Sequence, residues 1–387
     1  MVLLQEDDTQ TDENVEMEEE VEIEDNSEEL EMQEPFNPTE IKIDTRNDTL
    51  RNIIDRLRNN EIDMNTEFQR HAELWDTKKM SRLIESILIR FPLPAFYFDA
   101  SNDDQWLVVD GLQRLSSIQR FVIDQNLKLS GLEYLQELFH KNYTELSRKY
   151  QRRIDECPVT LFLIQPGTPK EVKFSLFRRI NTGGLLLKDQ EIRNAMTDPS
   201  VRDYLNELSS YEYLTSTIGN QSKRMKDKEL ILRFFAFYTM DFAGFKKNIT
   251  SFLDAMNMRL EKLTKLELEE YREIFYRAIQ RCYDLFGSDA FEKKTSTAGS
   301  CVKKNSSLFE VWTVAMAKVS QEQFDVLLAN KDIVKEKHQK MIEEDNQYVN
   351  SITYSTQKIS HFRYRHEAVN RLLQEVYDAG ICTNPTI

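Results

Sequence analysis

The sequence predicts an α+β protein in which a small sheet with helices is followed by an all-helical half. Convincing strand patterns end at residue 164, whereas apolar residues recur at helical spacing from about residue 201 onward. An acidic stretch precedes both regions. These observations divide the chain into an acidic tail (1–37), an α+β domain (38–200) and a helical domain (201–387).

The acidic tail accounts for the net charge of −15. Residues 1–34 hold 16 of the 66 acidic residues and none of the 51 basic ones, so the rest of the chain carries 51 basic against 50 acidic residues. A segment with so little apolar surface cannot offset the entropy lost on folding, and we expect it to be disordered. It either only keeps the chain soluble or competes with phosphate-bearing ligands for basic residues on the body.

The cysteines and the hydropathy indicate a cytoplasmic protein. The four cysteines are scattered without paired spacing, which indicates reduced thiols rather than disulfides or a zinc site. No apolar run is long enough to cross a membrane, and the first residues lack the basic region of a signal peptide. We therefore expect a soluble chain with no membrane partner.

The strands of the α+β domain are recognised by alternating or β-branched residues. Residues 41–43 alternate as an edge strand does, 95–98 and 106–109 suit a hairpin, and 159–164 form the strongest strand pattern in the chain.

Helical periodicity fills the intervals between these strands. Asp48 or Thr49 can cap the first helix, and Pro92 and Pro94 end the second. The helical patterns of this domain begin at residue 50 and then cover residues 78–89, 112–122, 169–180 and 191–196. The basic stretch 141–153 is either a solvated helix face or a contact for a nucleic-acid backbone.

The helical domain shows no strand pattern and no internal repeat. In residues 266–286, for example, six apolar side chains fall on one stripe. The helical segments expected here are 224–240, 248–263, 266–286, 305–319, 321–345 and 358–378.

The stretch 106–120 carries the strongest candidate site. A short buried strand ends at Asp110, and helical spacing begins at Leu112, so Asp110-Gly111 is a strand-to-helix turn. The first N–H groups of a helix lack partners, Gly111 removes the Cβ that would keep a ligand away, and Arg114 can grip a phosphate with its fork. The alternative is structural: Asp110 caps the helix, Gly111 permits the turn, Gln113 is a surface amide, and Arg114 is a solvated surface residue or forms a salt bridge.

Two further segments suit the same type of ligand. Phe68-Gln69-Arg70 could bring a second guanidinium, and Asn181-Thr182-Gly183-Gly184 offers N–H groups able to form an anion nest. Glu191 and Asn194 share one helix face and could hold Mg²⁺ while Arg193 reaches a phosphate. Together these residues suit a nucleoside triphosphate with a metal ion.

In their order and spacing, the three segments resemble the GmrSD-type restriction family, whose N-terminal domain has a ParB/sulfiredoxin-like fold with a small mixed sheet. The match comprises Phe68-Gln69-Arg70, Val109-Asp110-Gly111-Leu112-Gln113-Arg114 and Phe177 to Ala195. The family usually has Gln-Gln after Asp-Gly, whereas Leu112 stands here at the first of these positions. Sulfiredoxin, the other branch of the fold, needs a cysteine in the Gly-x-x-Arg turn, which this chain lacks, so thiol chemistry is not expected.

The resemblance implies that the Asp-Gly-Gln-Gln-Arg segment hydrolyses a nucleotide in defence against foreign DNA. Carried over, Asp110 would position water or metal, Gln113 would orient a phosphate or water, and Arg114 would neutralise developing charge. Gln69, Arg70, Gly111, Asn181, Thr182, Gly183 and Arg193 would bind nucleotide or phosphate, with Mg²⁺ on Glu191 and Asn194. Two alternatives remain: a non-catalytic DNA-binding or adaptor module, which Leu112 favours, and a nuclease using the same phosphate pocket.

Many members of this family carry a C-terminal His-Asn-His nuclease, and this sequence shows no such pattern. His338, His361 and His366 lie in amphipathic or charged helical segments without the surrounding ββα-metal pattern, and we expect structural or surface roles for them. A DNA-cutting activity would then come from the N-terminal domain or from a separate nuclease or effector protein.

Overall fold

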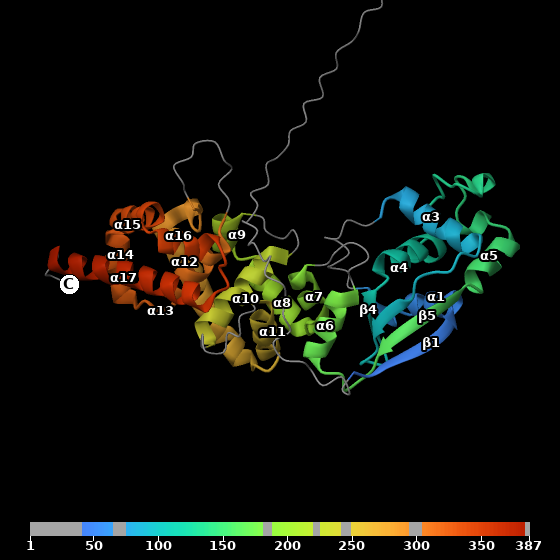
Figure 1. Ribbon diagram of the computed structural model, residues 1–387, viewed down its shortest axis with the longest axis horizontal. Coiled ribbons are helices and arrows are strands. Elements are labelled where there is room, and N and C mark those ends of the chain that lie inside the picture. The colour runs from blue at the N-terminus through green and yellow to red at the C-terminus, as the bar shows by residue number, and fades with distance from the viewer. Residues whose placement is uncertain are drawn as a thin grey trace, which may run out of the picture.

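The computed structural model describes residues 41–64, 75–180, 188–219, 225–240, 249–293 and 304–383. The acidic tail therefore lies outside the described residues, as do the site candidates Gln69, Arg70, Asn181, Thr182 and Gly183. The described part is elongated, with the sheet at one end and the helical region at the other (Figure 1).

Five strands form one mixed sheet in the order β1-β5-β3-β4-β2. Strand β5 is antiparallel to β1 and parallel to β3, whereas β4 is antiparallel to β3 and parallel to β2. The strands are β1 (Ile43–Thr49), β2 (Ile62–Asp63), β3 (Phe96–Asp99), β4 (Trp106–Asp110) and β5 (Pro158–Ile164). The predicted α+β class, with its small mixed sheet and helical second half, is confirmed.

The helices of the first half flank this sheet. They are α1 (Leu50–Arg58), α3 (Thr77–Leu88), α4 (Leu112–Ile118), α5 (Arg148–Asp155), α6 (Lys170–Ile180) and α7 (Asp189–Met196). Helix α4 continues as the π-helix η2 (Gln119–Ile123), and short 3₁₀ turns, η3 (Gln136–Leu138) and η4 (Tyr143–Glu145), precede α5.

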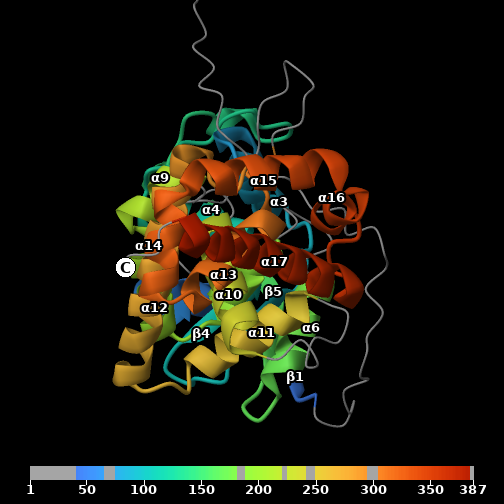
Figure 2. The ribbon, with the colours of Figure 1, turned by 90° about the vertical axis from the view of Figure 1, so that its left-hand side faces the viewer.

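The second half is built from helices packed around one large core. They are α8 (Pro199–Ser209), α9 (Glu212–Ile218), α10 (Lys226–Thr239), α11 (Ile249–Leu260), α12 (Lys265–Phe286), α13 (Ser306–Lys318), α14 (Gln321–Ala329), α15 (Lys331–Glu344), α16 (Asn346–Thr353) and α17 (Ile359–Thr383), with a 3₁₀ turn η8 (Gly287–Asp289). Seen from this end, the long α17 crosses in front of α13, against which it packs (Figure 2). No helix among the described residues combines the length and the apolar character needed to cross a membrane.

Three sequence expectations need adjustment. Strand β1 lies at 43–49 rather than 41–43, because its pairing with β5 holds a polar, mostly exposed segment that has no hydrophobic signature. The helix of the basic stretch begins only at Arg148, since Asn142 caps the separate turn η4. The expected helix 321–345 is two helices that meet at Asn330.

Alternation along the strands gives the sheet two apolar faces. Phe96 and Phe98 of β3 face a core shared with α1, α3 and α4, whereas Tyr97 faces a smaller core with α6 and α7. On β4, Val109 belongs to the smaller core, together with Ile192 of α7. Strand β4 is therefore the element that the helices carrying the sequence motifs share.

The buried Glu85 of α3 organises a loop on the first face. Its carboxylate accepts hydrogen bonds of 2.7–3.1 Å from the backbone N–H groups of residues 133, 134 and 135. Burial raises the pKa of Glu85, but these three hydrogen bonds and Arg82 outweigh burial, and the pKa lies below its ordinary value.

We predict that Glu85→Gln lowers the free energy of unfolding by about 1–3 kcal/mol at neutral pH, because the amide nitrogen of glutamine cannot accept these bonds. In the parent chain, ionised Glu85 stabilises the fold above its unfolded pKa of about 4.3, and this contribution is lost as the pH falls through the lower folded value. Urea unfolding of both chains between pH 3 and 7 measures both effects. The exposed Glu133→Gln serves as the control and should change stability by less than about 0.5 kcal/mol; equal effects of the two variants would contradict the account.

Candidate functional site

Strand β4 is connected to α4 by Gly111, whose backbone is left-handed. This agrees with the strand-to-helix turn that the sequence predicts. Gly111 has φ 105° and ψ 7° and is the N-cap of α4, with no capping side chain. A Cβ at this position would lie 2.4 Å from Cδ1 of Phe96 and 3.3 Å from Nη2 of Arg114. Glycine is thus required both by the backbone conformation and by Phe96, which occupies the space we expected a ligand to enter.

Arg114 faces the protein rather than the solvent. Its guanidinium donates to the carbonyl oxygens of Pro94 and Ala95, the latter at 3.1 Å, and to Oδ2 of Asp110 at 2.8 Å. It also lies 4.4 Å from the centroid of the Phe96 ring, and the residue is 8% exposed. Burial lowers the pKa of Arg114, while Asp110 acts in the opposite direction. Arg114 is therefore neither the solvated residue of the structural alternative nor a fork open to a phosphate.

Asp110 does not cap the helix, because its carboxylate turns to Arg114. About a third of its side chain is exposed, against a tenth for Arg114. In this ion pair, the guanidinium of Arg114 is buried and the carboxylate of Asp110 is partly exposed at the surface. This geometry holds one carboxylate in a fixed orientation at the carboxyl end of β4.

Gln113 ties the first sequence segment to the second. Its Oε1 accepts a hydrogen bond of 3.0 Å from the backbone N–H of Trp75, just before α3. Strand β2 runs parallel to β4, so the chain leaves β2 toward the end where Asp110 stands. The two described neighbours of the segment that holds Gln69 and Arg70 are β2 and Trp75, and both lead to the β4–α4 junction. The roles of Gln69 and Arg70 stay predictions.

The third segment reaches β4 from the opposite face of the sheet. Helices α6 and α7, which flank the segment holding Asn181, Thr182 and Gly183, share the smaller core with Val109. Within α7, Glu191, Arg193 and Asn194 are 2%, 1% and 1% exposed. The Glu191 carboxylate accepts from the backbone N–H of Lys188 at 2.7 Å.

Arg193 and Arg178 converge on one carboxylate of the helical domain. Asp254 of α11 accepts a hydrogen bond of 2.7 Å from Nη2 of Arg178 and one of 2.8 Å from Nε of Arg193. Arg178 also donates to Asp189, and Arg193 to Gln190 and to the carbonyl of Thr250. We call Arg178, Arg193, Asp189 and Asp254 the interdomain cluster. Because the guanidinium of Arg193 donates to acceptors within the protein, it is not available to a phosphate.

Asp254 belongs to none of the three sequence segments, but the pattern of its own helix marks it. Most of the buried face of α11 is apolar, yet Asp254 and Asn257 lie on it, three residues apart. Asn257 exchanges hydrogen bonds of 2.9 and 3.2 Å with Thr197, which follows α7. Buried polar groups on an otherwise apolar face indicate a specific partner.

Three histidines of the helical domain have structural contacts. His338 is buried beside Trp312 and Tyr348, and burial lowers its pKa to about 4. His366 lies 2.9 Å from Oε1 of the buried Glu310, and Nδ1 of the half-buried His361 lies 3.1 Å from a backbone carbonyl oxygen. Within the described ranges, no group of three His, Cys, Asp or Glu side chains is placed to hold a metal ion.

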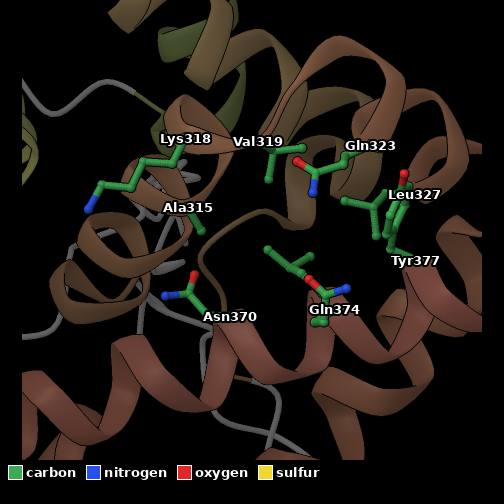
Figure 3. A pocket seen from close by; sticks show the side chains of 9 residues that line it. Ala315, Lys318, Val319, Gln323, Leu327, Asn370, Gln374 and Tyr377 are labelled. Atoms are coloured by element: carbon green, nitrogen blue, oxygen red, sulfur yellow. The ribbon is translucent and has the colours of Figure 1, made fainter.

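A groove of about 210 Å³ lies elsewhere, between α13, α14 and α17 (Figure 3). Its lining mixes Leu327 and Leu373 with polar side chains such as Asn370 and Gln374. None of the residues expected to act on a phosphate lines it, so the candidate site remains the β4–α4 junction.

We predict that Gly111→Ala lowers the free energy of unfolding by at least about 2 kcal/mol more than Gly287→Ala. Both glycines have a positive φ, but nothing lies within 4 Å of a Cβ at Gly287, so only Gly111 adds an overlap with Phe96. Denaturant unfolding measures the difference. Equal losses would show that Phe96 yields and that the packing at the junction is loose.

We further predict that Asp254→Ala destabilises the chain by about 3–5 kcal/mol, because it leaves the buried Arg193 and the half-buried Arg178 without their shared acceptor. Asp189→Ala, which removes a more exposed member of the same cluster, should cost clearly less. Calorimetric unfolding compares the two. A loss below about 1 kcal/mol for Asp254→Ala would contradict the role given to the cluster.

Comparison with known proteins agrees with the resemblance that the three segments indicate. No curated protein and no solved structure matches the chain. Residues 50–197 match the model of the family described as GmrSD restriction endonuclease, N-terminal domain. The matched region begins with α1 and ends just after α7, so it holds the β4–α4 junction and both arginines of the interdomain cluster. Residues 50–197 of this chain thus resemble a GmrSD-type N-terminal domain.

Proposed function

We propose that the chain takes part in restriction of foreign DNA and that its N-terminal domain binds and hydrolyses a nucleoside triphosphate as a sensor or switch. The family description of residues 50–197 supports the first half of the proposal. The second half rests on one observation: Asp110 presents a carboxylate, held by an embedded arginine, where the flanks of the motif segments meet.

On this geometry, the proposal gives a direct role to Asp110 and an indirect one to Arg114. Because the fork of Arg114 is engaged by Pro94, Ala95 and Asp110, its main contribution is to hold the carboxylate of Asp110 in one orientation. A carboxylate held in this way can orient a water molecule for attack on a phosphoryl group. Gln113, which joins α4 to the entry of α3, fixes the position of the neighbouring backbone.

Of the predicted metal ligands, Asp110 fits Mg²⁺ better than Glu191 and Asn194 do. Magnesium usually binds through one or two carboxylates together with substrate phosphates and waters, which requires a carboxylate open to solvent. The side chain of Asp110 is partly exposed, whereas Glu191 and Asn194 are buried within the packing of α7. A bound magnesium ion would neutralise phosphate charge at this position.

A non-catalytic DNA-binding or adaptor module is the second candidate. Leu112 favours it, because this side chain packs against the core on the α4 side of the sheet, where the family usually has a polar glutamine. The nuclease alternative uses the same carboxylate on a DNA phosphodiester. A separate nuclease or effector protein remains a proposed partner in the first two cases.

The test is phosphate release by the full chain with each of the four ribonucleoside triphosphates and Mg²⁺, with and without DNA. We predict that Asp110→Asn, which keeps the size of the side chain and an acceptor for Arg114, lowers kcat by at least about 100-fold. Asp103→Asn, in the exposed turn between β3 and β4, is the matched control and should leave the rate unchanged.

The outcomes separate the three candidates. Turnover that Asp110→Asn removes supports the triphosphatase. Nucleotide binding without turnover supports the non-catalytic module, and plasmid nicking that depends on Asp110 supports the nuclease. Full turnover in Asp110→Asn, with an unchanged melting temperature, would contradict the site.

A further inference from the structure

Helices α1 and α5 form a basic surface on a chain that is acidic overall. They pack together at the sheet end of the molecule, with Ile54 and Ile154 in the same core (Figure 1). Helix α1 carries three arginines and one aspartate, and α5 carries three arginines, one lysine and one aspartate. The two short helices, which we call the α1–α5 face, thus carry a formal net charge of +5, of which Arg56 pairs with Glu61 at 3.1 Å, whereas the whole chain has a net charge of −15.

The cations of this face gather around the turn that precedes α5. Burial and Asp155 raise the pKa of Tyr143 in this turn, while the charges of Arg58, Arg148 and Arg51 act against this rise. Arg51 and Arg58 are seven residues apart and therefore share one side of α1. All three are exposed. Arg51 and Arg58 of α1 and Arg148 of α5 thus present positive charge to solvent.

Part of this charge has no counterion within the described residues. Arg58 pairs with Asp55 at 3.1 Å, and Arg148 approaches Asp155 only to 3.9 Å. The structure pairs none of Arg51, Lys149 and Arg152 with a described carboxylate, and all three are exposed. Surface pairs at such distances contribute little to stability, so the arrangement is better explained by a polyanionic ligand.

The chain itself contains a polyanion of suitable length. Residues 1–34 carry 16 acidic residues and no basic one. The described chain starts at Ile41, and β1 leads directly into α1 at Leu50. Because β1 is about 24 Å long, the first described residue, Ile41, lies within about 30 Å of the start of α1.

We propose that the α1–α5 face binds the acidic segment 1–34 of the same chain. A random coil of about 40 residues has a root-mean-square span of about 35 Å, so a segment of this length is long enough to bridge such a distance. Linkers of matching length give effective concentrations in the millimolar range, so the tethered segment outcompetes free polyanions of similar charge. The contact is electrostatic, weakens with salt, and does not depend on the nucleotide site.

Carbodiimide crosslinking of the full chain tests this directly, because the reagent joins a carboxylate to a lysine amine only when the two are in contact. We expect peptides that join Lys149 to an acidic residue of segment 1–34 in monomeric protein at 50 mM salt, and their loss at 500 mM salt. Arg51→Glu/Arg152→Glu should reduce these products at least fivefold. The matched control, Lys331→Glu/Lys335→Glu on the exposed side of α15, makes the same change of charge and should leave them unchanged.

Two results would overturn the proposal. One is crosslinking of the segment to Lys149 no faster than to Lys331, or crosslinking only between two molecules. The other is a loss of affinity for a single-stranded oligonucleotide in Arg51→Glu/Arg152→Glu while the crosslinks persist, which would make the face a nucleic-acid site instead. Both double variants change exposed residues, and an unchanged melting temperature confirms that they fold.

Discussion

The left-handed turn at Gly111 is the constraint on which the rest of the candidate site depends. It reverses the chain from β4 into α4 so sharply that the guanidinium of Arg114 returns to the start of β3 and reaches Asp110. Phe96 fills the space beside the glycine and stacks under the same guanidinium. One backbone conformation thus fixes the ring, the cation and the carboxylate together, and only glycine adopts it here without displacing the ring.

Strand β4 connects this turn to the rest of the molecule because it is covered on both faces. On one face it packs with α4 and α3, and on the other Val109 meets α6 and α7. These two helices in turn hold Asp254 of α11 through Arg178 and Arg193. The interdomain cluster balances two cations with two carboxylates, so Arg193 and Asp254 can be buried in it. It joins the matched region to the helices that follow by directional bonds rather than by apolar contact alone.

The sequence predicts elements well where burial imposes a period, and site geometry less well where side-chain direction decides. The alternation of Phe96 and Phe98 and the helical spacing after Leu112 predict the sheet and α4, because both follow from which side chains are excluded from water. The hydrophobic pattern does not predict strand β1, because backbone pairing with β5 holds its polar residues in place. From the sequence, Arg114 and Arg193 are both expected to bind phosphate. In the structure, both side chains point inward, because they donate to carbonyl or carboxylate oxygens of distant segments. Asp254 lies outside every motif and becomes visible only through its partners.

The most direct test of the central claim is a crystal structure of the chain with Mg²⁺ and a non-hydrolysable nucleoside triphosphate. The account predicts phosphate density beside the exposed carboxylate of Asp110, with Arg114 still bonded to Pro94 and Ala95. Phosphates bound away from the β4–α4 junction would contradict the assignment of the site. A guanidinium that leaves Pro94 and Ala95 to grip the phosphate would contradict the positioning role given to Arg114.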